Sequence, residues 1–416
     1  MRISPSRLTR LRQLTRWCAL AALSAGLVAC GGGGSDGGGA EPPAPAPAPA
    51  PPPMPAPEEQ GGLRSAQFVN TLTATQVQAA LADSRLGPET TAVARYGVSN
   101  YRITYTTTDK NGQRVVASGL VSVPSKATGA ASPVLSYQHA TIFHNDEAPS
   151  IRTEPGEPPM VLASQGYIVV SPDYVGFGST QDLEHPYLTA EATANAVVDL
   201  LVAAQSWRWQ QGVADNGQLF LAGYSEGGYA TMAAHRALQG IGTHGWLTQQ
   251  VVASVPGAGP YDVQFTLDEL REGLPSWLRA LFNPGNLSRA PESVRNEVRR
   301  LLVRQLFPDD ADVTYQTLFI DRYLADDRDA IARDHSVHLG WAPQAPVYLF
   351  HGQDDRTVPY GASVSALQAL RSAGAGAGAA NVSLTDCTTG DRGHLGCVPE
   401  YFEFTMKRLG SLARDL

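Results

Sequence analysis

The sequence is poor in cysteine and in charged residues. Its 416 residues include four cysteines, and 17% of the residues are charged. The cysteines lack the C-x-x-C spacing typical of structural zinc sites, which argues against a zinc centre. Basic residues are scarce outside the N-terminus. Five arginines lie in the first 29 residues, and the rest of the chain has 26 Lys and Arg against 39 Asp and Glu, which gives it a net charge of −13. An acidic body without a basic patch argues against a nucleic-acid partner.

The apolar run near the N-terminus is too short to cross a membrane as a helix. It covers residues 17–29 and follows a segment that contains five arginines and no acidic residue. A basic segment followed by a short apolar one is typical of an export signal. The sequence therefore predicts a signal peptide over residues 1–30.

A cysteine ends this predicted signal. The tetrapeptide Leu27-Val28-Ala29-Cys30 resembles the lipobox of bacterial lipoproteins. The resemblance implies that Cys30 is lipidated and becomes the first residue of an exported protein anchored to the cell envelope. The residue after Cys30 is Gly31 rather than aspartate, which resembles the signal for sorting to the outer membrane if the source is Gram-negative. The sequence does not decide whether the protein faces the periplasm or the outside. An ordinary signal peptide that happens to end in cysteine is the alternative.

Residues 31–62 consist almost entirely of Gly, Ala and Pro. Gly-rich chain is flexible, and a Pro-Ala repeat is extended and semi-rigid, so neither can build a hydrophobic core. We therefore expect a disordered spacer here. The folded domain is predicted over residues 63–416.

This domain alternates strand and helix patterns. Residues 101–107 and 114–123 flank Asn111-Gly112, a hairpin turn signal. Further strands are expected at residues 134–137, 167–171, 219–222, 251–255, 347–350 and 382–384, and helices at 73–81, 190–207, 230–234, 363–371 and 400–412. A hairpin followed by alternating strands and helices predicts an α/β fold with a mostly parallel central sheet flanked by helices.

Residues 260–340 interrupt the alternation with amphipathic segments, for example over residues 291–306. They predict a helical insertion between strands. An insertion at this point would cover the strand ends, so we expect a cap or lid. The alternative is a helical wing without contact to the site.

The segment Gly223-Tyr224-Ser225-Glu226-Gly227 carries the strongest chemical signal. It follows a short apolar run and precedes a helix-compatible one. Strand, tight G-x-S-x-G turn and helix form the pattern of a nucleophile elbow, in which glycines avoid collisions and the helix N-terminus faces an oxyanion. The pattern predicts Ser225 as a nucleophile.

An acid and a base follow in the expected order. Asp354 and Asp355 come after a predicted strand, and Asp355 fits the form H-G-x-x-D-x-x-V-P. His394 lies in a glycine-flanked loop after the last predicted strand, whereas His139 and His351 sit at strand ends and compete for the role of base. The order Ser225, Asp355, His394 is that of the α/β-hydrolases, so these three are the predicted catalytic residues.

Cys387 and Cys397 bracket His394 in the sequence. An exported protein meets oxidising conditions, so we expect a disulfide between them. It would fix the histidine loop, add stability, or both. Metal binding by these two cysteines is disfavoured because their spacing is wrong for zinc.

The oxyanion hole requires two backbone N–H groups. One is expected from Glu226, directly after the nucleophile, and the other from the loop after the third predicted strand. Thr141 is the preferred donor in that loop and Ala140 is the alternative.

Three segments together resemble the secretory lipase branch of the α/β-hydrolases, the Candida lipase A type. They are Tyr137-Gln138-His139-Ala140-Thr141, Pro172–Gly178 with His185-Pro186-Tyr187-Leu188, and Gly223–Gly228. The resemblance runs from about residue 95 to 410 and implies carboxylic ester hydrolysis beneath a helical cap. Ala140 departs from the usual glycine, which leaves the second oxyanion donor open.

The sequence thus predicts an exported lipase or carboxylesterase that works through a Ser-His-Asp triad and an acyl-enzyme. This chemistry requires no metal or organic cofactor. The expected partners are a small-molecule or lipid ester and, through the anchor, a membrane; no obligate protein partner is inferred. A serine peptidase of the same fold and a catalytically idle, tethered binding protein are the alternatives.

Overall fold

The computed structural model describes residues 54–83, 92–240, 245–279, 286–374, 381–388 and 390–416. The predicted export signal, Cys30 and the predicted spacer as far as residue 53 lie outside the described residues. Among the described residues, no helix is both long and apolar enough to cross a membrane.

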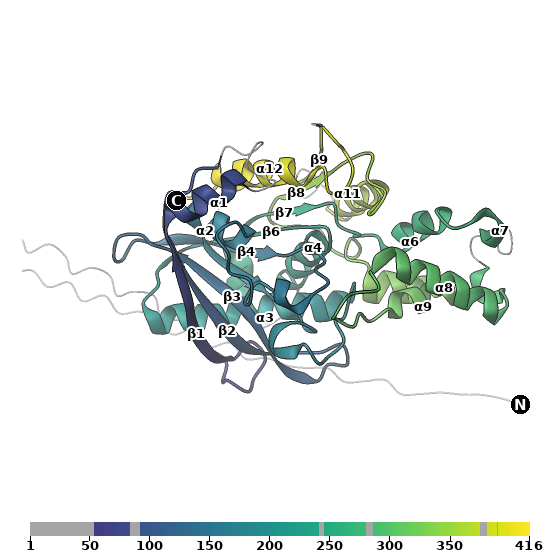
Figure 1. The fold of residues 1–416 in the computed structure, drawn as a ribbon, viewed down its shortest axis with the longest axis horizontal. Coiled ribbons are helices and arrows are strands. Elements are labelled where there is room, and N and C mark those ends of the chain that lie inside the picture. The colour runs from purple at the N-terminus through teal and green to yellow at the C-terminus, as the bar shows by residue number, and fades with distance from the viewer. Residues whose placement is uncertain (1–53, 84–91, 241–244, 280–285, 375–380, 389) are drawn as a thin grey trace, which may run out of the picture. The chain divides into compact units, whose positions relative to one another are not determined.

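Strands and helices alternate along most of the domain (Figure 1). The strands are β1 (Leu63–Leu72), β2 (Val98–Thr108), β3 (Arg114–Pro124), β4 (Ser132–Gln138), β5 (Ile168–Pro172), β6 (Asp215–Tyr224), β7 (Val251–Gly257), β8 (Val347–His351) and β9 (Val382–Asp386). The helices and helical turns are α1 (Ala74–Asp83), η2 (Asn145–Glu147), α2 (Pro158–Ser164), η3 (Gly178–Thr180), α3 (Ala190–Gln211), α4 (Glu226–Leu238), α5 (Gly245–Gln250), α6 (Val263–Glu272), α7 (Ser276–Arg279), η4 (Leu287–Arg289), α8 (Glu292–Leu306), α9 (Leu318–Leu324), α10 (Arg328–Ala330), η5 (Ile331–His335), α11 (Gly361–Ala373) and α12 (Val398–Gly410).

The strands form one mixed sheet in the order β1-β2-β3-β5-β4-β6-β7-β8-β9. The neighbouring pairs β1–β2, β2–β3 and β3–β5 are antiparallel. The remaining pairs in this order, from β5–β4 to β8–β9, are parallel. The hairpin β2–β3 turns at Gly112, whose φ of +74° suits glycine. The expected α/β fold with a mostly parallel sheet is confirmed.

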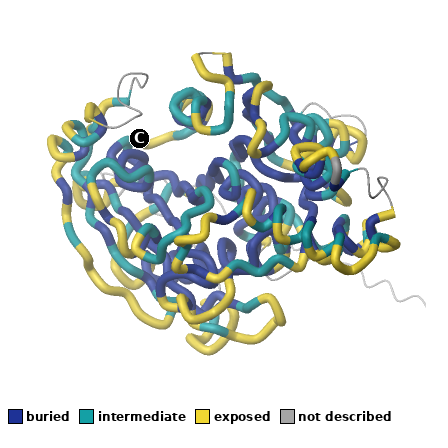
Figure 2. The backbone as a smooth tube through the Cα atoms, turned by 45° about the vertical axis from the view of Figure 1, so that its right-hand side comes forward, coloured by how far each residue is buried: buried dark blue, intermediate teal, exposed yellow. Residues whose placement is uncertain are grey.

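Helices cover both faces of the sheet (Figure 1). One face packs on α3 and α4, through a core that includes Val134, Leu200 and Ala234. The opposite face packs on α2 and α12, through a core that includes Leu162 and Tyr401. Because the central strands are buried on both faces, their sequences are nearly continuous apolar runs, as parallel sheets require. Figure 2 shows this buried interior and the exposed outer segments.

The edge strand β1 was not among the expected strands. Its first nine residues are exposed or half-buried, and its sequence lacks the alternation of apolar and polar residues that marks a half-buried strand. The chain contacts the sheet even earlier, since Thr106 Oγ1 donates to Pro57 O at 2.6 Å and Gly61 N donates to Thr106 O at 2.9 Å.

The helical insertion joins β7 to β8 and contains the elements from α6 to η5. In Figure 1, α6, α7, α8 and α9 lie together beyond one end of the strands. Leu267 of α6, Leu302 of α8 and Phe319 of α9 are buried in one hydrophobic cluster. Helix α8 buries Val298 and Leu302, four residues apart, whereas its charged residues are exposed or half-buried.

Candidate active site

Ser225 occupies a strained turn between β6 and α4. Its φ of +60° and ψ of −123° are disfavoured for a residue with a side chain. Its N–H donates to Gly257 O at 2.9 Å, which helps to hold the turn. A Cβ at Gly223 or Gly227 would collide with the Gln138 carbonyl, so only glycine fits at either position. The backbone thus has the geometry of the predicted elbow.

The structure brings together the three predicted catalytic residues from three separate loops. His394 Nε2 lies 2.8 Å from Ser225 Oγ, and His394 Nδ1 lies 2.6 Å from Asp355 Oδ2. Asp355 follows β8, and His394 lies between β9 and α12. The hydroxyl, imidazole and carboxylate therefore form one continuous hydrogen-bonded chain.

Asp355 is buried and accepts hydrogen bonds at both oxygens. Oδ1 accepts from the N–H groups of Thr357 and Val358, each at 2.9 Å, and Oδ2 accepts from His394 and from His351 Nε2 at 3.1 Å. Burial alone would raise the pKa of Asp355, but the hydrogen bonds from His351 and His394 lower it to about 2. The carboxylate is consequently ionised at neutral pH.

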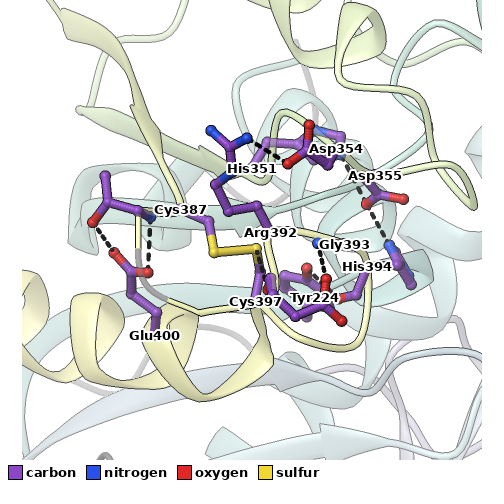
Figure 3. The surroundings of a disulfide bond; sticks show 12 residues. Tyr224, His351, Asp354, Asp355, Cys387, Arg392, Gly393, His394, Cys397 and Glu400 are labelled. Atoms are coloured by element: carbon purple, nitrogen blue, oxygen red, sulfur yellow. Dashed lines mark hydrogen bonds and ion pairs between the residues drawn. A yellow bond between two sulfur atoms is a disulfide. The ribbon is translucent and has the colours of Figure 1, made fainter.

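The loop that carries His394 is fixed at several points (Figure 3). The expected disulfide between Cys387 and Cys397 is present and closes this loop. Tyr224 Oη donates to His394 O at 2.7 Å. Arg392 forms an ion pair at 2.6 Å with Asp354, the exposed neighbour of Asp355, so Asp354 faces away from the imidazole.

The competing histidines have other partners. His139 Nδ1 lies 2.7 Å from Ala140 O, and burial lowers the pKa of this side chain. His351 Nδ1 lies 2.7 Å from Ser363 Oγ. Both imidazoles are buried behind the site and neither contacts Ser225, so His394 is the histidine positioned to act as its base.

A cavity of about 450 Å³ opens beside Ser225 and His394. Most of its lining is apolar and comes from the loop after β4, from the helical insertion and from the loop that carries His394. The apolar lining residues are Ala140, Phe143, Leu188, Pro260, Val263, Leu267, Leu270, Leu306, Phe319, Val358, Leu395 and Val398. Helices of the insertion therefore form one wall of this cavity.

The predicted oxyanion donors lie next to the same cavity. Glu226 begins α4, so its backbone N–H has no carbonyl one turn earlier in the helix. Thr141 and Ala140 both line the cavity across from the elbow. Their arrangement fits the predicted hole, and the choice between Thr141 and Ala140 stays a prediction.

The sequence analysis missed two contacts made by buried histidines. His351 was considered only as a competing base, yet it binds the carboxylate of Asp355. His185 appeared only as part of a family resemblance, yet its Nε2 lies 2.6 Å from Glu226 Oε1. The H-G-x-x-D spacing could have indicated the first contact, whereas no local pattern joins residues 185 and 226.

In the described parts of the chain, no three His, Cys, Asp or Glu side chains gather in a way that could hold a metal ion. The polar groups near Ser225 are instead hydrogen-bonded to one another. The arrangement can activate a hydroxyl and receive its proton.

Comparisons with known proteins agree with the fold described above. Residues 160–241 match the secretory lipase family. The chain is similar to the ligand-bound rice cell wall degrading esterase LipA from Xanthomonas oryzae, with 25% identity and a TM-score of 0.66 over 86% of this chain and 100% of that chain. A putative hydrolase from Legionella pneumophila has 23% identity and a TM-score of 0.65 over 84% of this chain and 98% of its own.

Candida antarctica lipase A in its closed state is similar in fold, with 17% identity and a TM-score of 0.53 over 86% of this chain and 84% of its own. No curated protein matches the chain. The mixed sheet with an elbow after β6 defines an α/β-hydrolase. Within that fold, the match over residues 160–241 agrees with the predicted secretory lipase branch, and the chain is a carboxylic ester hydrolase. The predicted α/β-hydrolase fold and the predicted enzyme class are confirmed.

Proposed function

We propose that the protein is an exported serine hydrolase that cleaves carboxylic esters through Ser225, His394 and Asp355. The observation that carries the proposal is the hydrogen-bonded chain from Ser225 Oγ through His394 to Asp355 at the wall of an apolar cavity. The same hydrogen-bonded arrangement activates the nucleophilic serine in hydrolases of several unrelated folds.

In the first step, Ser225 Oγ attacks the ester carbonyl carbon while His394 Nε2 accepts the hydroxyl proton. Asp355 accepts a hydrogen bond from His394 Nδ1, which selects the reactive tautomer and stabilises the imidazolium. His394 then gives its proton to the leaving alcohol. The products of this step are the free alcohol and an acyl-enzyme on Ser225.

In the second step, water attacks the acyl-enzyme and His394 again acts first as base and then as acid. The N–H groups of Glu226 and Thr141 stabilise the negative oxygen in both tetrahedral intermediates. Removal of one such donor costs roughly 2.7–4 kcal/mol of transition-state stabilisation in hydrolases of this kind. The strained elbow keeps the Glu226 N–H in place before substrate arrives.

The cavity favours an apolar acyl group. Leu267, Leu270 and Leu306 of the insertion face the space beside Ser225. Burial of each methylene contributes about 0.8 kcal/mol, so longer acyl chains gain binding energy until the cavity is full. We infer a medium-chain or longer acyl group on this side of the scissile bond.

The leader supports export with a lipid anchor. The basic and apolar segments, the lipobox-like Leu27–Cys30 and the Gly/Pro/Ala-rich spacer have the order of a bacterial lipoprotein. We infer that Cys30 carries the lipid and that the spacer separates the domain from an envelope membrane. Radiolabelled palmitate incorporated by the wild type and lost in Cys30→Ala would support this, and equal labelling of both would refute it.

The function is tested by hydrolysis of p-nitrophenyl esters from acetate to palmitate. We expect turnover by the wild type, loss of at least 10³-fold in Ser225→Ala, and full activity in Ser65→Ala, which removes an exposed serine on β1. Peptide anilides provide the control for peptidase activity. Activity that survives in Ser225→Ala, or anilide cleavage faster than ester cleavage, would refute the proposal.

A further inference from the structure

A buried imidazole–carboxylate pair lies directly behind the nucleophile. His185 Nε2 is 2.6 Å from Oε1 of Glu226, and both side chains are almost completely buried. The other ring nitrogen, His185 Nδ1, lies 2.7 Å from Val175 O. Because a carbonyl oxygen can only accept, Nδ1 carries a hydrogen and a further proton lies between Nε2 and Glu226.

The place of this carboxylate is electrostatically unfavourable for the proposed reaction. Glu226 is the first residue of α4, and its own N–H is a proposed oxyanion donor. The N-terminal end of a helix carries partial positive charge that stabilises nearby anions. An uncompensated carboxylate at this end would compete with the oxyanion for that charge, at low dielectric and without solvent screening.

Besides His185, five titratable side chains interact electrostatically with Glu226 or lie around it. They are His139, Tyr174, Tyr187, Tyr229 and Tyr315. Burial lowers the pKa of the histidine and raises the pKa of each tyrosine, so all five are uncharged at neutral pH. Among the described residues, His185 is the one basic side chain within ion-pair distance of Glu226.

The backbone on both sides fixes His185. Its N–H donates to Thr314 O at 2.8 Å, and its carbonyl accepts from Gln316 N at 2.9 Å, so the helical insertion holds it through a short parallel bridge. From the other side, Gly176 has a φ of +98°, and a Cβ there would lie 2.6 Å from His185 Cα. The backbone of His185 therefore cannot move away from Glu226 without displacing the insertion.

We propose that His185 is a positioning residue of the esterase site, which neutralises the Glu226 carboxylate and so keeps the oxyanion hole free of competing negative charge. The inference rests on the proposed function, because it requires the Glu226 N–H to face the oxyanion. It assigns a role to the insertion as well, since the bridge at Tyr315 holds the imidazole in place.

The test is the pH dependence of kcat in His185→Gln. Glutamine can still donate to Glu226, but it cannot carry a charge. Burial then favours the protonated acid at low pH, and the acid ionises as the pH rises. In the wild type we expect kcat to reach a plateau as the pH rises and to stay level. In His185→Gln we expect an added fall at alkaline pH, to about 10- to 100-fold below wild type at pH 9, with KM little changed.

The double variant His185→Gln/Glu226→Gln isolates the cause. It removes the acid, so the alkaline fall should disappear and kcat at pH 9 should exceed that of His185→Gln. His235→Gln is the matched control, because His235 is also a buried histidine, lies on α4 and contacts Ser254 rather than a carboxylate. It should alter stability and leave the shape of the pH profile unchanged.

An equal loss of kcat at all pH values in the single and double variants would overturn the proposal and leave a packing role. Circular dichroism and thermal unfolding check that each variant folds. Should His185→Gln fail to fold, Glu226→Asp withdraws the carboxylate by one methylene and should show the same alkaline fall, whose absence overturns the proposal. Failure of the proposed function is distinct, because the wild type would then lack Ser225-dependent turnover.

Discussion

At the scale of single residues, two adjacent aspartates have opposite environments. Asp355 is buried and held by four hydrogen bonds, two of them from imidazoles, whereas Asp354 is exposed and paired with Arg392. The H-G-x-x-D spacing favoured Asp355 from the sequence alone, and the hydrogen bond to His394 agrees with that preference. The contact with His351 depends on the fold of the loop after β8 and was not foreseen.

Asp355→Asn should lower kcat on the order of 10³- to 10⁴-fold, because an amide no longer selects the reactive tautomer of His394. Asp354→Asn is the matched control and should change kcat by less than about threefold, since exposed ion pairs contribute little. Steady-state kinetics with p-nitrophenyl butyrate measures both. A larger loss in Asp354→Asn than in Asp355→Asn would mean that the wrong acid has been chosen.

At the scale of elements, the helical insertion shapes the cavity. Leu267 of α6 is buried and lines the space beside Ser225, whereas Leu318 at the start of α9 is 37% exposed and does not line it. These two leucines allow the cavity wall to be changed separately from the rest of the insertion.

Leu267→Trp should shorten the acyl chains that the enzyme accepts. The larger side chain takes up cavity volume, so we expect the palmitate-to-butyrate ratio of kcat/KM to fall about tenfold or more. Overpacking should also cost about 1–3 kcal/mol of stability. Leu318→Trp is the control and should leave the ratio unchanged. An unchanged ratio in Leu267→Trp would show that acyl chains bind elsewhere.

The sequence predicted buried elements better than exposed or short ones. Strands β4, β6 and β8 are apolar runs because both their faces are covered, and such runs are visible in the sequence. Edge strand β1 lacks such a signal, and helix α2 is buried and apolar but only seven residues long, so both were missed. The pairing of His185 with Glu226 joins residues 41 apart on different elements, so only tertiary structure reveals it.

At the scale of the whole molecule, the disulfide restricts the unfolded chain as well as the site. Cys387 and Cys397 are ten residues apart and join the end of β9 to the start of α12. A cross-link of this length removes conformational entropy from the unfolded ensemble worth roughly 2–3 kcal/mol in the chain-entropy model. The same bond closes the loop that presents His394.

The double variant Cys387→Ser/Cys397→Ser should lower the free energy of unfolding by about 2–3 kcal/mol. The loop would also be less restrained. We therefore expect kcat to fall even at temperatures well below the unfolding temperature, and KM to change less. Denaturant unfolding and ester kinetics at 25 °C measure the two effects. The wild type in dithiothreitol should reproduce the variant, and an undiminished kcat in both would restrict the disulfide to a stabilising role.

The bridge between His185 and Tyr315 has a consequence for how such an enzyme can diversify. Tyr315 also donates a hydrogen bond to Ile142 O, so the insertion is fastened at this residue to the loop that follows β4. The stretches on either side of this fastening can lengthen, shorten or change sequence while the fastened residues keep their positions. Substrate range can therefore change by exchange of the flanking helices, with the machinery around Ser225 inherited intact.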